Sequence, residues 1–292
     1  MTQVDSVSET LPIKPGGKFI EVEKVIGNKK PGLLKVLPGF IINYLKRIIH
    51  QDEINDFIER NKSVYGLEFV ERIVNEFIRQ LNAKGVENIP TGKRILIASN
   101  HPLGGLDGVV LMHVAGKIRP DILFPVNDLL MNLENIKNLF IPINKHGSNS
   151  QNLKIINDTF ASEVSVLYFP AGLCSRKQKH GIIEDLEWKK TFISYARKYQ
   201  RDIVPTFIDG RNSDFFYNLA RFRKMIGIKQ NIEMLYLVDE MYKQKYKTIN
   251  IIVGKPIPFE TFDKRFSDNQ WAQKVKEHVY RLSVDNQAEF II

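Results

Sequence analysis

One short segment of the sequence combines a histidine and an aspartate at a spacing that suits acid–base chemistry. His101 follows an apolar run at 95–98, and Asp107 comes six positions after His101. A neutral imidazole can take a proton from an alcohol near pH 7, and a carboxylate on its other nitrogen fixes the tautomer and stabilises the imidazolium. The pair is therefore a candidate base with its orienting partner. Alone, such a pair also fits a turn histidine followed by an aspartate that caps a helix.

Glycines accompany this pair and a second block further along the chain. Gly104 and Gly105 stand between His101 and Asp107, and Gly172 follows another apolar run. Glycine permits close backbone approach, so amides at these positions could point at a developing oxyanion or simply form turns.

The elements that must position these residues follow an α/β pattern. From residue 95 onward, short apolar runs alternate with segments of helical periodicity, which predicts a mixed sheet flanked by helices. The expected strands are 95–98, 122–126, 140–143, 164–169, 203–208 and 249–253, and the expected helices are 185–199, 213–226 and 269–284. In such sheets, chemistry gathers where strands end and loops begin.

Three regions are expected along the chain. Residues 1–30 are polar and indicate a mobile tail, 31–84 are predicted to be helical, and 85–292 form the α/β domain. Within the helical region, 33–49 is apolar with interspersed cations, which suits either a bilayer interface or a pair of core helices. The sequence has no apolar run of membrane-spanning length, so any membrane role is expected at the surface.

Composition narrows the function classes. The 292 residues carry a net charge of +9, which suits nucleic acid, anionic lipid or an acidic carrier protein. No zinc-finger spacing or aromatic RNA-binding segment occurs, so nucleic acid is not expected. A single cysteine, Cys174, excludes an internal disulfide framework, and the first residues do not form a signal peptide. We therefore expect a protein of a reducing compartment; if it acts on membranes, it should do so as a peripheral protein on the cytoplasmic side of the cell membrane.

The His101 segment resembles the first motif of the PlsC-like glycerolipid acyltransferase superfamily, whose usual form is Asn-His-x4-Asp. Three further blocks follow in the family order, at 140–145, 169–176 and 203–206. The resemblance covers roughly 93–258 and implies a glycerol-phosphate acyltransferase-like fold. It also implies transfer of a fatty acyl group from acyl carrier protein or a coenzyme A thioester to a hydroxyl, with His101 and Asp107 as the catalytic pair.

The sequence departs from that family pattern in two ways. Five residues, not four, separate His101 from Asp107, and the glycine pair is expected to absorb the extra one as a bulge. In the family, arginines of the second and third blocks are associated with the acceptor's phosphate. Here the second block has Asn144-Lys145 at that place, and in the third block the arginine, Arg176, stands further along the chain. Loss of a bidentate arginine fork weakens recognition of a phosphate monoester.

These departures predict an unusual acceptor, such as a lyso-aminolipid that carries glycine, serine or ornithine. The pattern His-Pro-x-Gly-Gly-x-Asp-Gly resembles the first motif of a branch of this superfamily that includes aminolipid O-acyltransferases and proteins labelled hemolysins. Lys145, Arg176 and Arg211 are the predicted headgroup ligands, with membrane lipids as partners and no metal or cofactor required. Two alternatives stay open: a non-catalytic lipid-binding protein, and a thioesterase or lysophospholipase. The Gly-x-Ser-x-Gly elbow, the dinucleotide fingerprint and the P-loop are all absent from the sequence.

Overall fold

The computed structural model describes residues 18–126, 130–142 and 149–292. The chain divides into two compact units, with the boundary between Arg60 and Asn61. Each unit is described by itself below.

The first unit consists of four short helices. They are α1 (Val22–Lys29), α2 (Pro31–Val36), α3 (Gly39–Ile48) and α4 (Gln51–Arg60). The Asn55 side chain accepts from the amide of Ile20 and donates to its carbonyl, both at 2.8 Å, and Gln51 accepts from the amide of Val22 at 2.9 Å. These contacts give α1 an ordered start inside the stretch that the sequence assigned to a polar tail. Residues 1–17 of that tail lie outside the described part.

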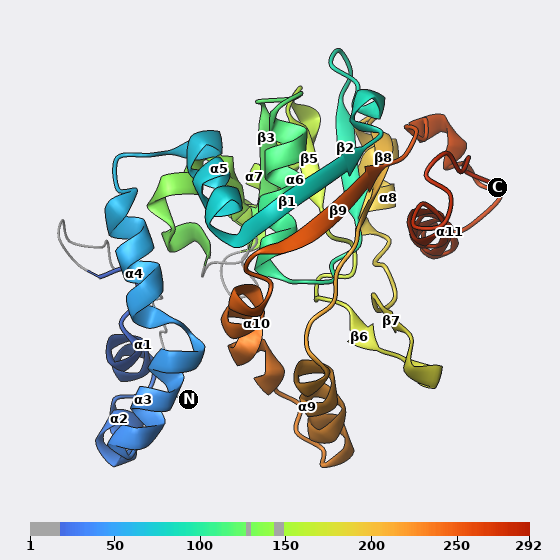
Figure 1. Ribbon diagram of the computed structural model, residues 1–292. Coiled ribbons are helices and arrows are strands. Elements are labelled where there is room, and N and C mark those ends of the chain that lie inside the picture. The colour runs from blue at the N-terminus through green and yellow to red at the C-terminus, as the bar shows by residue number, and fades with distance from the viewer. Residues whose placement is uncertain (1–17, 127–129, 143–148) are drawn as a thin grey trace, which may run out of the picture. The chain divides into compact units, whose positions relative to one another are not determined.

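The second unit contains a seven-stranded mixed sheet (Figure 1), as the sequence predicted. Its order is β1 (Ile78–Lys84), β9 (Lys247–Val253), β8 (Asp202–Ile208), β2 (Ile95–Ser99), β5 (Ser165–Tyr168), β3 (Ile122–Val126) and β4 (Phe140–Pro142). All neighbouring pairs are parallel except β8 and β9. The carboxyl ends of β8, β2, β5, β3 and β4 therefore lie at one edge of the sheet.

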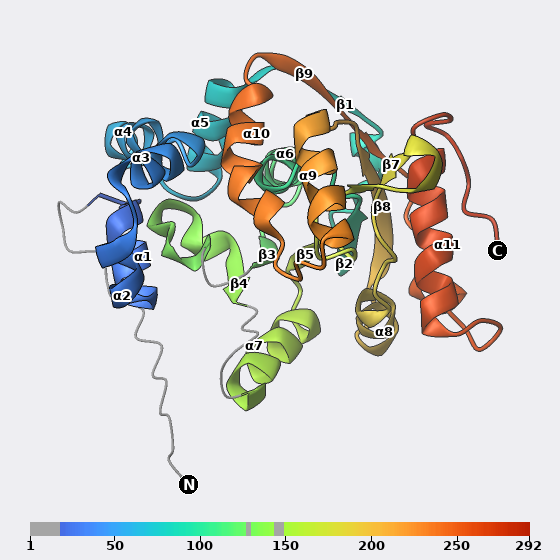
Figure 2. The ribbon, with the colours of Figure 1, turned by 90° about the horizontal axis from the view of Figure 1, so that it is seen from below.

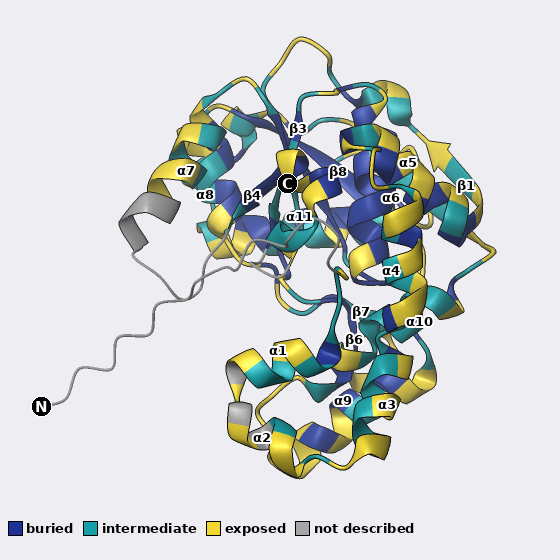
Figure 3. Ribbon diagram, turned by 90° about the vertical axis from the view of Figure 1, so that its left-hand side faces the viewer, coloured by how far each residue is buried: buried dark blue, intermediate teal, exposed yellow. Residues whose placement is uncertain are grey.

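Helices cover both faces of this sheet. The larger ones are α5 (Gly66–Phe77), α6 (Gly105–Gly116), α7 (Asn149–Ala161), α8 (Thr191–Lys198) and α11 (Asp268–Arg281). Helices α5 and α6 pack together, and Figure 2 shows α6 and α8 on opposite sides of the sheet. Helix α6 is almost entirely buried (Figure 3), which explains why its sequence is apolar all round.

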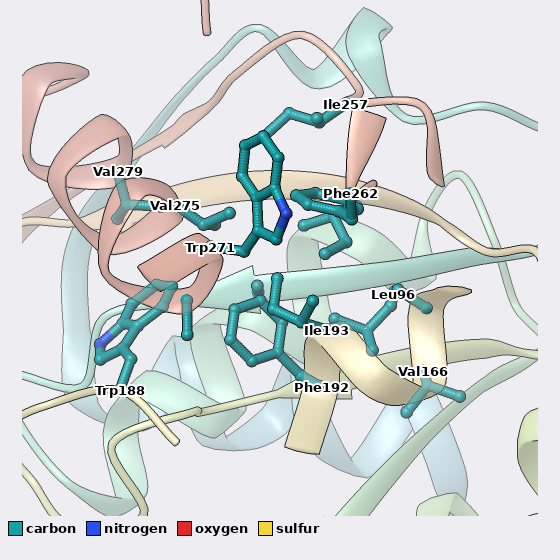
Figure 4. Packing of buried hydrophobic residues seen from close by; sticks show 14 of the residues in the cluster. Leu96, Val166, Trp188, Phe192, Ile193, Ile257, Phe262, Trp271, Val275 and Val279 are labelled. Atoms are coloured by element: carbon teal, nitrogen blue, oxygen red, sulfur yellow. The ribbon is translucent and has the colours of Figure 1, made fainter. Parts of the chain in front are cut away.

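Aromatic side chains fill the core on the α8 and α11 face. Trp188, Phe192, Phe262 and Trp271 are fully buried beside aliphatic side chains of β2 and β8 (Figure 4). Trp271 meets Phe262 edge to face, with ring centroids 5.6 Å apart. This packing fixes the strands whose ends carry the catalytic candidates.

The structure differs from the sequence expectation at two element boundaries. The helical spacing of apolar residues runs through Leu81, but α5 ends at Phe77 and the chain continues as β1, which pairs in parallel with β9. Tertiary pairing overrides the local periodicity here, so α5 and β1 belong to the second unit. The helix expected from 185 begins only at Thr191, because Asp185 and Trp188 are used in a loop that packs against β2 and α11.

Two further helices follow β8 along the chain: α9 (Asp214–Met225) and α10 (Leu237–Lys243). The Ser213 hydroxyl caps α9 by accepting from the Phe216 amide at 3.3 Å, at the residue where the sequence placed the start of this helix. A two-stranded antiparallel hairpin, β6 (Arg176–Lys177) and β7 (Ile183–Glu184), contacts α9. Across the described residues, no helix has the length and apolar character needed to cross a membrane.

Arg201 closes the opposite edge of the sheet, at the amino end of β8. It is fully buried, and its guanidinium donates to five backbone carbonyls. The acceptors are Phe160 (2.8 Å), Ile95 (3.1 Å), Val164 (2.6 Å), Thr159 (3.1 Å) and Ser162 (2.6 Å). Burial lowers the pKa of Arg201 to about 10, which keeps the side chain charged at neutral pH.

We expect Arg201→Met to lower the free energy of unfolding by about 3 kcal/mol or more, because the five carbonyls lose a charged donor in a buried place. Chemical denaturation followed by circular dichroism measures this change. Arg265→Met, at an exposed arginine paired with Asp263, is the matched control and should change stability by less than about 1 kcal/mol. Equal losses for both variants would contradict the role given to Arg201.

Candidate active site

The loop after β2 is tied to the neighbouring strand by Asn100. Its side-chain oxygen accepts from the Ile208 amide at 2.7 Å, and its nitrogen donates to the Ile208 carbonyl at 2.9 Å. Asn100 is buried, so this two-way pairing joins the carboxyl ends of β2 and β8 without contact with solvent. The next residue, His101, is thereby held at the edge of the sheet where loops gather.

His101 and Asp107 lie together as the sequence predicted. The His101 Nδ1 atom is 2.9 Å from Asp107 Oδ2. The same oxygen accepts from the amides of Leu103 at 2.7 Å and Gly104 at 2.9 Å, so the loop wraps around the carboxylate. Gly104 has a φ of +85°, a backbone conformation that glycine adopts readily and other residues rarely do. The extra residue is therefore accommodated in the turn, at Gly104.

The Asp107 carboxylate is fully buried at the first turn of α6. Burial raises the pKa of Asp107, while hydrogen bonds from His101 and from the Leu103 and Gly104 amides act in the opposite direction. The positive end of the α6 dipole favours negative charge at this position. These contacts suit a carboxylate that orients an imidazole and balances its charge.

The other side of the imidazole is open. The His101 ring stacks on Phe169 with centroids 4.2 Å apart and planes 15° apart, and 19% of its side chain is exposed. Within the described part of the chain, its Nε2 atom has no hydrogen-bond partner. Since Nδ1 is engaged by Asp107, Nε2 is the atom that can accept a proton from a substrate hydroxyl.

Asp185 is a buried residue of this site that no sequence motif marks. One carboxylate oxygen accepts from the His101 amide at 3.1 Å and from the Ser175 hydroxyl at 2.6 Å. Its second oxygen accepts from the Trp188 indole at 2.9 Å. The Ser175 amide in turn donates to the His101 carbonyl at 2.7 Å. Asp185 therefore fixes the backbone of His101, while Asp107 holds its ring.

We expect Asp185→Asn to lower kcat by roughly ten- to a hundredfold with little change in KM, because an amide cannot accept from all three donors and the His101 backbone shifts. Steady-state kinetics measures kcat and KM separately. The matched control is Asp202→Asn, a buried carboxylate at the far edge of the sheet that accepts from Lys93 and from the Phe259 amide. An equally large loss of kcat in Asp202→Asn would show that the Asp185→Asn loss comes from impaired folding, and would contradict the positioning role of Asp185.

The three predicted oxyanion glycines occupy different environments. The Gly104 amide donates to Asp107, and the Gly172 amide donates to the Phe169 carbonyl at 3.0 Å in a turn where Gly172 has a φ of +67°. Both glycines thus serve turns. Gly105 lies in the first turn of α6 with open space beside its Cα, which leaves room for a substrate. The oxyanion role stays a prediction, and the placement favours Gly105 for it.

Arg176, a predicted headgroup ligand, points into the protein. It is 4% exposed, pairs with Glu233 at 2.9 Å and lies over the Phe216 ring at 5.2 Å. Its guanidinium also donates to the Cys174 carbonyl at 2.7 Å and to the sulfur at 3.0 Å. Burial raises the pKa of Cys174, which disfavours the thiolate form, so this thiol is not a candidate nucleophile.

The other two predicted headgroup ligands are in different positions. Arg211 is exposed and pairs with Asp214 at 2.6 Å, so its guanidinium is accessible to an anionic ligand. Lys145 lies outside the described residues, as does Asn144. The headgroup roles of Arg176, Arg211 and Lys145 stay predictions.

Comparisons with known proteins identify the family of this chain. A family model described as Acyltransferase matches residues 24–288. Two relatives, from Phocaeicola vulgatus and Bacteroides thetaiotaomicron, are named lyso-glycine lipid O-acyltransferase. Each is 48% identical over 266 residues, covering 90% of this chain and 95% and 97% of theirs. Among solved structures, the 1-acyl-sn-glycerophosphate acyltransferase PlsC of Thermotoga maritima aligns over 82% of this chain and 79% of its own, with 15% identity and a TM-score of 0.47.

The family model covers most of the chain, and the relatives cover it almost end to end at high identity. These findings confirm the resemblance that was read from the His101 segment and the three blocks after it. This chain belongs to the acyltransferase family and is an acyltransferase.

Proposed function

We propose that this enzyme transfers a fatty acyl group from an acyl thioester to the hydroxyl of a lyso-glycine lipid. The observation that carries the chemistry is the 2.9 Å contact between His101 Nδ1 and Asp107 Oδ2, which leaves Nε2 to accept the substrate proton. The names of the two relatives support the choice of acceptor. This activity would serve membrane lipid biosynthesis.

The proposed reaction proceeds by direct attack. His101 Nε2 takes the proton of the acceptor hydroxyl while the oxygen attacks the thioester carbonyl, and Asp107 balances the imidazolium charge. The tetrahedral intermediate collapses as the carbon–sulfur bond breaks. The imidazolium then returns its proton to the leaving thiolate, so the products are an ester and a free thiol. The side chains named here supply every proton transfer, and we propose that no metal or cofactor takes part.

Two features support an acceptor that is not a phosphate monoester. Arg176 occupies the block where the family resemblance placed a phosphate ligand, yet it is buried against Glu233 and Phe216. Arg211 is exposed near the start of α9 and can offer a fork to a single carboxylate. A glycine headgroup ends in one carboxylate, which is the chemistry that Arg211 would recognise.

We further propose that the enzyme works at a membrane surface on the cytoplasmic side, with acyl carrier protein or coenzyme A carrying the acyl group. In the first unit, Val36, Phe40 and Tyr44 are exposed on α2 and α3, alongside Lys46 and Arg47. Aromatic and cationic side chains in this arrangement suit the interface of a bilayer.

Competition among acceptors tests the proposal. We expect kcat/KM for a lyso-glycine lipid to exceed that for lysophosphatidate by at least tenfold, measured by mass spectrometry of the products with one acyl-thioester donor. Arg211→Gln should reduce that preference by raising KM for the glycine headgroup, whereas Arg265→Gln, at an exposed arginine that pairs with Asp263, should leave it unchanged. A preference for lysophosphatidate would contradict the proposed acceptor.

A further inference from the structure

Helix α9 has one face fixed to the protein and one face left open. Its inner residues Phe216, Tyr217, Ala220 and Arg223 are buried. Near its carboxyl end, Phe222, Met225 and Ile226 are 52%, 74% and 52% exposed. Three large apolar side chains side by side in solvent are unusual for a surface helix and indicate an interaction site.

The exposed end is firmly anchored. Arg223 pairs with Glu233 at 2.5 Å, and the same buried carboxylate pairs with Arg176 at 2.9 Å. At the start of the helix, the amide and hydroxyl of Ser213 both donate to the buried Glu240, at 2.5 and 2.6 Å. The apolar side chains are therefore held in solvent by a rigid base, and do not result from fraying of the helix end.

Charge around these side chains has one sign. The stretch 215–232 contains no aspartate or glutamate, while Arg221, Lys224 and Lys229 are exposed. In the part of the chain that the structure describes, none of these three cations forms an ion pair. Apolar side chains ringed by unpaired cations complement a surface that is anionic outside and apolar within, which is the make-up of a bilayer with acidic lipids.

The position of α9 connects this surface to the active site. Just before the helix, the Asn212 side chain donates to the Pro102 carbonyl at 3.3 Å, directly beside His101. From there α9 extends away from the carboxyl edge of β8 (Figure 1). Twelve helical residues span about 18 Å, so its far end stands roughly that distance from the catalytic loop. Such a distance suits a helix that contacts a bilayer while the catalytic loop stays above the headgroups.

We propose that the α9 tip, defined as Arg221, Phe222, Lys224, Met225 and Ile226, docks this unit on an anionic bilayer. The three apolar side chains enter the interface, and the two cations lie at the level of the lipid phosphates. The choice of a bilayer as the partner rests on the proposed lipid acceptor. Docking would hold the catalytic loop over the headgroups of the membrane that contains the acceptors.

Depth-dependent quenching tests the docking directly. The two native tryptophans, Trp188 and Trp271, are buried, so they give a steady background. We expect the indole introduced by Phe222→Trp in the full chain to shift to shorter emission wavelengths on vesicles of phosphatidylcholine with about one third phosphatidylglycerol. Lipids brominated on their acyl chains should quench it. Val284→Trp, at a side chain that is 92% exposed beyond α11, should show neither effect.

Vesicle sedimentation gives a second readout. Phe222→Ser combined with Met225→Ser should weaken partitioning at least tenfold, and Arg221→Gln with Lys224→Gln should weaken it roughly tenfold at low salt only. Val284→Ser with Ile291→Ser, which removes two exposed apolar side chains elsewhere, should leave partitioning unchanged.

Absence of quenching in membrane-bound Phe222→Trp would overturn the proposal, because another surface would then hold the protein on the vesicle. Protection of the same indole by an acidic carrier protein in solution, without quenching by lipid, would overturn it in favour of a protein partner. Neither measurement contains an acyl donor or a lyso-lipid. Docking can thus be confirmed when the proposed acceptor fails, and the acceptor can be confirmed when docking fails.

Discussion

Replacement of His101 by alanine is expected to lower acyl transfer by about 10³-fold or more while the fold is retained. The imidazole lies beside a buried carboxylate and keeps its second nitrogen for the substrate, so its loss removes the acceptor for the hydroxyl proton. The ring is partly exposed, so its removal creates little cavity and should cost little stability. Initial rates with a lyso-lipid acceptor, together with thermal unfolding, measure both quantities.

His113 supplies a matched control for that variant. It lies on α6, only partly exposed, and burial lowers its pKa. His113→Ala should therefore keep activity within a few-fold of wild type. Transfer by His101→Ala at a tenth of the wild-type rate or above would contradict the role of His101 as base.

Asp107→Asn is expected to lower kcat by about 10³-fold, again without global unfolding. The amide is neutral, so it cannot stabilise the imidazolium that forms when Nε2 takes the substrate proton. The amide oxygen can still accept from the Leu103 and Gly104 amides, so the turn is preserved. Because the two residues act as one unit, the double variant with His101→Ala should be no slower than His101→Ala alone.

Comparison of the single and double variants decides whether the pair works together. Additive losses would show that Asp107 acts on something other than His101. Retention of more than a third of the wild-type kcat by Asp107→Asn would remove the carboxylate from the mechanism. Asp202→Asn serves again as the buried control, since its contacts lie at the opposite edge of the sheet.

The sequence predicted the central part of the fold because strands and turns there follow local rules. The runs at 95–98, 122–126 and 203–208 became β2, β3 and β8 almost to the residue, and the helix expected at 213–226 became α9. Local rules failed where tertiary contacts decide: β1 extends an apolar pattern of helical spacing, and α1 forms in a polar segment through side chains from α4.

The site also combines features set by local sequence with features set by tertiary contacts. His101, Asp107 and the glycine that absorbs the extra residue could be predicted, because the chemistry and the turn both lie within seven residues. Asp185 could not, since it reaches His101 from 84 positions away and no motif marks it. For Arg176, the motif predicts a charge near the site, but the direction of the side chain is set by the buried Glu233, which no local rule reveals.

The fate of a labelled acyl group tests the central claim most directly. Purified enzyme would be mixed with an acyl thioester labelled in the acyl chain and with lyso-glycine lipid, and free thiol and labelled products would be counted together. We predict one thiol released for each labelled diacylated lipid formed, and neither product above background with His101→Ala. Thiol release with the label in free fatty acid, unchanged by the presence of the lyso-lipid, would identify water as the acceptor and contradict the account.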